Sequence, residues 1–173
     1  MNIFFVDENP RIAAKCLGDK HVGKMLIESC QMMSTVLRSH GLDVGYKSSY
    51  ENHPMTKWVG QSYAHYDWLV QHAIGLAEEF EYRYDHPHAS SALLPNLVIH
   101  SGHVPMRGWR NPPRCMPDQY KLNYDVWSRE GDGTPCHVAS YRNFYKAEKT
   151  TCHKWTRRAP PPWMELGEEV TNE

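Results

Sequence analysis

Hydrophobic residues recur at helical spacing along residues 19–38, DKHVGKMLIESCQMMSTVLR. This i, i+3, i+4, i+7 pattern is typical of a helix that buries one face, with Asp19 suited to the N-cap. The buried positions would be Val22, Met25, Leu26, Ser29, Met32, Met33, Val36 and Leu37. The opposite face would place polar side chains in one line: His21, Lys24, Glu28, Gln31 and Thr35.

A second long helix is expected from Pro54 to about Tyr84. Its buried face would comprise Trp58, Ser62, Tyr66, Leu69, Ala73, Leu76, Ala77 and Phe80. The other side would carry His65, His72, Glu79 and Arg83. We expect Glu79 and Arg83, four residues apart, to pair on the surface, where such a pair is worth a few tenths of a kcal/mol.

Shorter segments complete the predicted fold. Residues 3–6 form a short apolar run whose length is compatible with a strand or with an extended arm packed on helices. Asn9-Pro10 is typical of a helix start and predicts a short helix to about residue 15. Another short helix is expected at 90–100, followed by an irregular proline-rich loop over 101–118.

Thr134-Pro135 predicts the start of a last helix, with the hydroxyl as cap, running to about residue 149. This helix would bury four residues: Val138, Tyr141, Phe144 and Tyr145. The chain is therefore expected to be mainly all-α, a compact single-domain helical fold over 1–164 with two long amphipathic helices and irregular Pro-rich loops. An acidic flexible tail is expected at 165–173.

The composition is typical of a globular domain. The chain of 173 residues is 40% hydrophobic and 23% charged, ordinary values for a globular domain. No apolar run approaches the ~20 residues needed to span a bilayer, and the N-terminus lacks the charge pattern of a secretory signal. The five cysteines form no paired framework. We therefore expect reduced thiols and a cytoplasmic location.

A basic segment stands out although the formal net charge is −1. Residues 140–158 contain six Lys and Arg residues, one acidic residue (Glu148) and several aromatic residues between them. Such a segment can hold phosphates and stack bases, or it can be a helix with core aromatics and solvated cations. The candidate nucleic-acid contacts here are Arg142, Lys146, Lys149, Lys154, Trp155, Arg157 and Arg158.

Metal and cofactor sites have weak support. The Cys136-His137 and Cys152-His153 pairs, with Cys115, lack the usual spacing of zinc ligands. Phosphate-binding glycine loops and a G-x-S-x-G elbow are absent from the sequence. We expect no metal and no cofactor.

The polar face of the first long helix suggests acid–base or electrostatic chemistry. A carboxylate such as Glu28, near His21, can stabilise the cationic state that forms when a glycosidic bond breaks. An amine would supply the nucleophile for Schiff-base chemistry. The candidates are Lys20, Lys24 and the α-amino group of Met1. An α-amino group has a pKa of roughly 7.7–8, so part of it is neutral near pH 7.

Three segments together resemble the pyrimidine-dimer DNA glycosylase family of small helical phage enzymes and their bacterial relatives. They are the opening MNIF, the stretch DKHVGKMLIES that carries Glu28, and YENHPMTKW at 50–58 leading to a helix that ends LAEEFEYRY. The resemblance covers about residues 1–85. It implies a compact helical fold and N-glycosylase and AP-lyase activity on DNA, through a terminal amine assisted by a glutamate, with a base flipped out.

Carried onto this chain, the resemblance implies that the amine of Met1 is the nucleophile, with Lys24 as an alternative and Glu28 stabilising the intermediate. His21, His53, Lys20 and the basic segment would hold phosphate. The protein would be phage-encoded and act in the host cytoplasm. Two alternatives stay open: a non-catalytic phage protein that binds nucleic acid or a host protein, and an enzyme acting on a free nucleotide.

Overall fold

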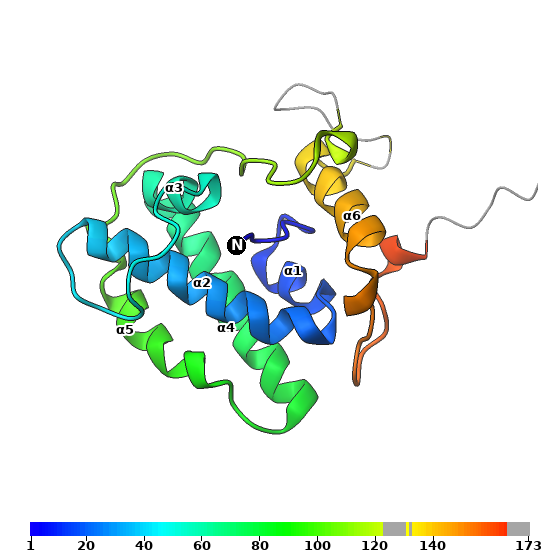
Figure 1. Cartoon of the computed structure of the whole chain (residues 1–173), viewed down its shortest axis with the longest axis horizontal. Helices are drawn as coiled ribbons and strands as arrows, with labels where there is room; N and C mark the ends of the chain where they lie inside the picture. The colour runs from blue at the N-terminus through cyan, green and yellow to red at the C-terminus, as the bar shows by residue number, and fades with distance from the viewer. Residues whose placement is uncertain (123–130, 132, 166–173) are drawn as a thin grey trace, which may run out of the picture.

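A computed structural model describes residues 1–122, 131 and 133–165. The described chain is mainly α-helical and contains no β-strand, which confirms the predicted fold class (Figure 1). The α-helices are α1 (Pro10–Cys16), α2 (Asp19–Ser39), α3 (Pro54–Gln61), α4 (Tyr63–Tyr84), α5 (Leu94–Ile99) and α6 (Cys136–Glu148). Short 3-10 helices occur at Ala89–Leu93, Ser101–His103, Asp118–Tyr120, Thr150–Cys152 and Pro162–Met164.

Helix α2 forms where the hydrophobic spacing predicts it and packs against α4 and α3 (Figure 1). All eight expected core positions of α2 are buried. The expected cap is wrong, however. Gly18 occupies the N-cap without a side-chain bond, and Asp19 is the first helical residue. The Asp19 carboxylate instead accepts bonds from Thr156 and from Arg83, so tertiary contacts take the place of a local cap.

The N-terminal residues 3–6 form a buried extended arm, so among the described residues the arm alternative holds. The Phe5 ring stacks on Trp68 with centroids 4.0 Å apart. Phe4 meets Tyr145 edge-on at 5.1 Å. The arm thus lies between α4 and α6, and the N-terminus lies in the middle of the view of Figure 1.

The predicted second long helix is wrong in one respect, because it is broken at Ser62. This residue has an extended backbone (φ −152°, ψ 141°) and separates α3 from α4. Its hydroxyl accepts a bond from the Ala64 N–H and donates one to the Arg107 carbonyl at 2.5 Å. Serine competes in this way with helical backbone bonding. The helical spacing of apolar residues continues across Ser62, so the sequence pattern did not predict the break.

The Glu79–Arg83 pair forms as predicted but not on the surface. Their side chains are 3% and 0% exposed. Arg83 also bonds Asp19 at 3.0 Å, and Arg158 bonds Glu79 at 2.5 Å. This buried network joins the start of α2, the end of α4 and the C-terminal segment. Breaking such a network is far more costly than losing a surface pair.

Helix α6 begins at Cys136, one residue later than expected, with Pro135 at the N-cap and no side-chain cap bond. The expected hydroxyl cap by Thr134 is therefore wrong. The predicted core residues of α6 are all buried: Val138, Tyr141, Phe144 and Tyr145. The expected tail at 165–173 lies outside the described residues except for Glu165. The division into one domain and a tail stays a prediction.

Candidate functional site: an amine and a carboxylate between the N-terminus and α2

The N-terminal arm places the Met1 amine beside Glu28 of α2. The amine nitrogen lies 3.8 Å from Glu28 Oε2, and the same oxygen accepts the Asn2 backbone N–H at 2.8 Å. Lys24, one turn earlier on α2, puts its Nζ 3.9 Å from Glu28 Oε1. The Glu28 side chain is 14% exposed, so the carboxylate is sheltered yet reachable.

The Met1 amine is held more firmly than the Lys24 amine. The Met1 side chain is 1% exposed, whereas that of Lys24 is 63% exposed. The Met1 sulfur accepts a bond from the Thr56 hydroxyl at 3.5 Å, and the Asn2 side chain donates to the Cys115 carbonyl at 2.9 Å. These contacts and the buried arm that follows fix the α-amino nitrogen relative to the carboxylate.

A cavity of about 210 Å³ opens over this pair. Its wall combines the terminus, the polar face of α2 and the aromatic face of α6, and it comprises Met1, Asn2, Phe4, His21, Lys24, Met25, Glu28, Phe144 and Lys149. Four of the five catalytic candidates from the sequence, Met1, His21, Lys24 and Glu28, therefore line one cavity, and Lys20 does not. Lys149, expected as a phosphate contact, lies here too, with its Nζ 4.7 Å from the Phe144 ring centroid.

His21 is a neutral, buried member of the wall. Its Nδ1 lies 2.8 Å from the Tyr145 hydroxyl, and its Nε2 lies 3.6 Å from the Cys152 sulfur. Burial lowers the pKa of His21 to about 4, helped by the positive charges of Lys24, Lys149 and His153. An uncharged imidazole with both nitrogens engaged orients its neighbours and does not act as a cation for phosphate.

His53 approaches the site from the start of α3. Its Nδ1 caps that helix by accepting the Met55 N–H at 3.2 Å. Burial lowers the pKa of His53 and the Met1 amine lowers it further, whereas Glu28 acts in the opposite direction. His53 is therefore within the electrostatic reach of the amine and the carboxylate.

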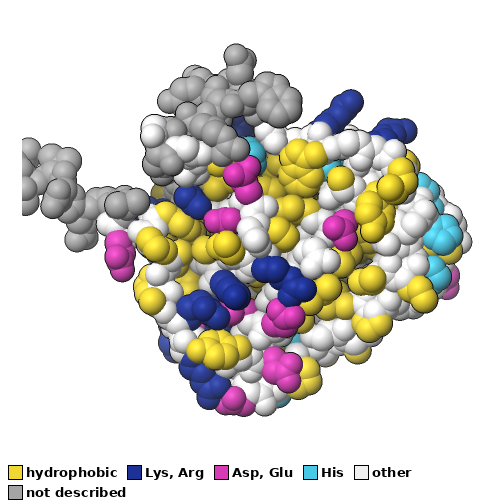
Figure 2. Space-filling view, turned by 180° about the vertical axis from the view of Figure 1, so that it is seen from behind, with side chains coloured by type: hydrophobic (Ala, Val, Ile, Leu, Met, Phe, Trp, Pro, Cys, Tyr) yellow, Lys and Arg dark blue, Asp and Glu magenta, His cyan; other side chains and the backbone are white. Residues whose placement is uncertain are grey.

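Most of the predicted nucleic-acid contacts in the basic segment 140–158 bond to other parts of the protein. Arg142 donates to the Val6 carbonyl at 2.8 Å, and the Trp155 indole donates to the Cys16 carbonyl at 3.0 Å. Arg157 pairs with Asp85 and Arg158 with Glu79. On the face seen in Figure 2, Lys and Arg side chains lie among Asp and Glu side chains. The segment thus fastens the C-terminal part to α1 and α4.

Three further lysines were predicted as phosphate contacts. Lys20 and Lys154 are exposed, and Lys146 is half-buried. None of them lines the cavity over Glu28. Their role as phosphate contacts stays a prediction.

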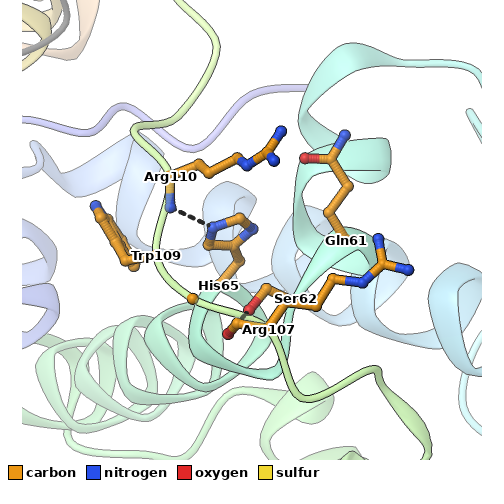
Figure 3. Close-up of a pocket in the computed structure, with 7 residues that line it drawn as sticks. Gln61, Ser62, His65, Arg107, Trp109 and Arg110 are labelled. Carbon is orange, nitrogen blue, oxygen red and sulfur yellow. Dashed lines mark hydrogen bonds between the residues drawn. The ribbon is translucent and has the colours of Figure 1, made fainter.

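A second, larger cavity of about 570 Å³ was missed from the sequence (Figure 3). It lies where α3 meets α4, against the proline-rich loop, and its wall comprises Gln61, Ser62, His65, Arg107, Gly108, Trp109 and Arg110. The sequence does carry a sign of this site. In Arg107-Gly-Trp-Arg110, an aromatic residue lies between two arginines, a combination that can bind nucleic acid.

Metal binding and membrane insertion find no site in the described residues. In residues 1–122, 131 and 133–165, no three His, Cys, Asp or Glu side chains gather as a metal would require. Over the same part of the chain, no helix has the length and apolar character needed to cross a membrane.

Comparison with known proteins identifies a family for this chain. Searches of curated proteins and of solved structures found no match. A family model described as pyrimidine dimer DNA glycosylase matches residues 1–91. The match covers the N-terminal arm, α2, α3 and α4, which include Met1 and Glu28, and it confirms the resemblance seen in the sequence. The chain belongs to the pyrimidine dimer DNA glycosylase family.

Proposed function

We propose that this protein is a DNA N-glycosylase with AP-lyase activity that uses the α-amino group of Met1 as its nucleophile. The observation that supports this best is the 3.8 Å approach of the Met1 nitrogen to Glu28 Oε2, in a cavity walled by aromatic residues. An amine held beside a carboxylate suits a reaction whose intermediate is a protonated imine. The family match supports DNA as the substrate.

The proposed reaction begins when the neutral amine attacks C1′ of the target nucleotide. The bond from C1′ to the base breaks, and the base leaves with the electron pair and takes up a proton. The bond from C1′ to the ring oxygen then opens, which leaves a positively charged imine between the Met1 nitrogen and the sugar. Glu28 would stabilise that charge. Loss of a C2′ proton then expels the 3′ phosphate and breaks the strand, and water hydrolyses the imine.

Lys24 is the alternative nucleophile, since its Nζ lies 3.9 Å from the other Glu28 oxygen. Its 63% exposure argues against it, because a mobile, solvated ammonium is held less well for attack. We assign Lys24 and Lys149 instead to charge balance at the cavity mouth, where a DNA phosphate would lie. His21 would hold the wall through Tyr145.

The test is reduction by borohydride in the presence of duplex DNA with one abasic site. The proposal predicts a covalent protein–DNA adduct, because borohydride reduces the imine to a stable amine. The controls are the intact duplex and a duplex whose abasic aldehyde has been reduced beforehand, neither of which can form the imine. An absence of adduct on the abasic duplex would contradict the lyase proposal.

A further inference from the structure

The second cavity is built by a loop that is anchored through its backbone. Ser62 donates to the Arg107 carbonyl at 2.5 Å. The Arg110 N–H donates to His65 Nε2 at 2.8 Å, and the Trp58 indole donates to the Arg110 carbonyl at 2.9 Å. Buried side chains of α3 and α4 thus hold this loop on both sides of Gly108, so the positions of the two arginines are fixed at the backbone.

His65 is neutral in this arrangement. Because Nε2 accepts the Arg110 N–H, Nδ1 carries the proton and donates to the Trp58 carbonyl at 2.8 Å. Burial lowers the pKa of His65, the bond to Trp58 raises it and the Arg110 charge lowers it. With no carboxylate in the wall, the charge of this cavity comes from Arg107 and Arg110.

Both guanidinium groups are available for a ligand. Arg107 and Arg110 are exposed, and neither makes a side-chain hydrogen bond or ion pair with any described residue. They differ in this from Arg83, Arg142 and Arg158, whose guanidinium groups bond within the protein. Figure 3 shows the Arg107, Arg110 and Gln61 side chains around the open space beside His65. Guanidinium groups in this setting match the oxygens of a phosphate.

The second cavity extends along α3. An adjoining cavity of about 430 Å³ shares Gln61 and Arg110 and adds the exposed Lys57. Its wall also includes Asn52 and Pro54, and Thr56 of the same helix α3 donates to the Met1 sulfur at 3.5 Å. The two cavities therefore form one groove beside α3, whose walls carry three cations (Lys57, Arg107 and Arg110) and no acidic side chain.

We propose that this groove binds the phosphodiester backbone of the DNA strand that carries the reacting nucleotide, with one phosphate held by Arg107 and Arg110. The inference rests on the proposed function and deepens it, because a cationic site outside the cavity over Glu28 selects a polymer over a free nucleotide. Nucleic acid is the occupant because the groove offers positive charge and an amide donor along its length. Arg107 and Arg110 position the strand and touch no reacting atom.

The test compares the DNA affinity of the wild type with that of Arg107→Ala/Arg110→Ala. The probe is a fluorescent duplex with one tetrahydrofuran abasic analogue, which cannot form an imine, so binding is measured without chemistry. Losing the phosphate that both arginines hold should flatten the plot of log affinity against log salt by about 0.9 and weaken binding about 8-fold at 0.1 M salt. The matched control is Lys15→Ala/Lys47→Ala, which removes two exposed cations outside the groove.

Borohydride trapping of free 2-deoxyribose 5-phosphate separates this inference from the proposed function. The groove variant should trap this small aldehyde as fast as the wild type, because the sugar reaches only the cavity over Glu28. An unchanged salt slope in the groove variant would overturn the inference even if trapping succeeds. An equal loss in the control variant would also overturn it, since binding would then follow total charge. A flattened slope without any trapping would support the groove while contradicting the lyase chemistry.

Discussion

Replacing Glu28 by glutamine removes the charge that the account places beside the cationic imine. The side chain keeps its size, and the glutamine oxygen can still accept the Asn2 N–H that Glu28 accepts at 2.8 Å. At the observed 3.8 Å, an ion pair is worth about 4 kcal/mol at the effective dielectric constant found near protein surfaces. That energy corresponds to about three powers of ten in rate.

Solvent in the open cavity screens part of this energy, so we expect trapping to slow by about 100- to 1,000-fold in Glu28→Gln. The assay is the initial rate of borohydride trapping on the abasic duplex, with the melting temperature recorded in parallel. Glu81→Gln is the matched control, because Glu81 is an exposed glutamate of α4 outside the cavity. A trapping rate in Glu28→Gln within about threefold of the wild type would refute the electrostatic role of Glu28.

Three further predictions concern stability and are measured by urea unfolding. Burial lowers the pKa of His72 from 6.5 to about 4. As the pH falls from 6.5 to 4, the unfolded state binds this proton before the folded state does, so the free energy of unfolding decreases. In His72→Gln the decrease over this pH range should be smaller by about 3 kcal/mol. Arg83→Met should cost about 3–5 kcal/mol, because it leaves buried carboxylates without their partner. Gly18→Ala should lower the free energy of unfolding by about 1–3 kcal/mol, because the new Cβ would lie 1.7 Å from the Cys152 carbonyl oxygen. The control is Gly102→Ala, which should change stability little because the space around Gly102 is open.

Each of these predictions has a contradicting result. An acid-side loss in His72→Gln as large as in the wild type would show that another group takes up the proton. A cost below 1 kcal/mol for Arg83→Met would mean that the network behaves as a surface pair. Equal stabilities of Gly18→Ala and Gly102→Ala would show that the segment at Cys152 yields without cost.

Local patterns predicted most of the helices. The spacing of apolar residues gave α2 and the core face of α6, because a buried helical face repeats at 3.6 residues whatever it packs on. The break at Ser62 did not follow from this pattern, since the bond that stabilises it goes to Arg107, 45 residues away. The burial of the Glu79–Arg83 pair likewise depends on Asp19 and Arg158, which only the tertiary fold brings together.

The site was predictable to the extent that it lies on one helix. His21, Lys24 and Glu28 share a face of α2 and were expected together. The approach of Met1 to Glu28 followed from the family resemblance and not from spacing. The second cavity needed the fold, because Gln61 and His65 come from two helices and Arg107 and Arg110 from a distant loop. The charge of the 140–158 segment pointed to DNA, yet all three of its arginines form internal contacts.

The central claim is that the α-amino nitrogen of Met1 forms the imine with DNA. The most direct measurement is mass-spectrometric peptide mapping of the borohydride-trapped adduct on an abasic-site duplex, after digestion of both protein and DNA. The account predicts that the sugar remnant is attached to the N-terminal peptide, on the α-amino nitrogen. Attachment to Lys24 or another lysine, or no adduct at all, would contradict it.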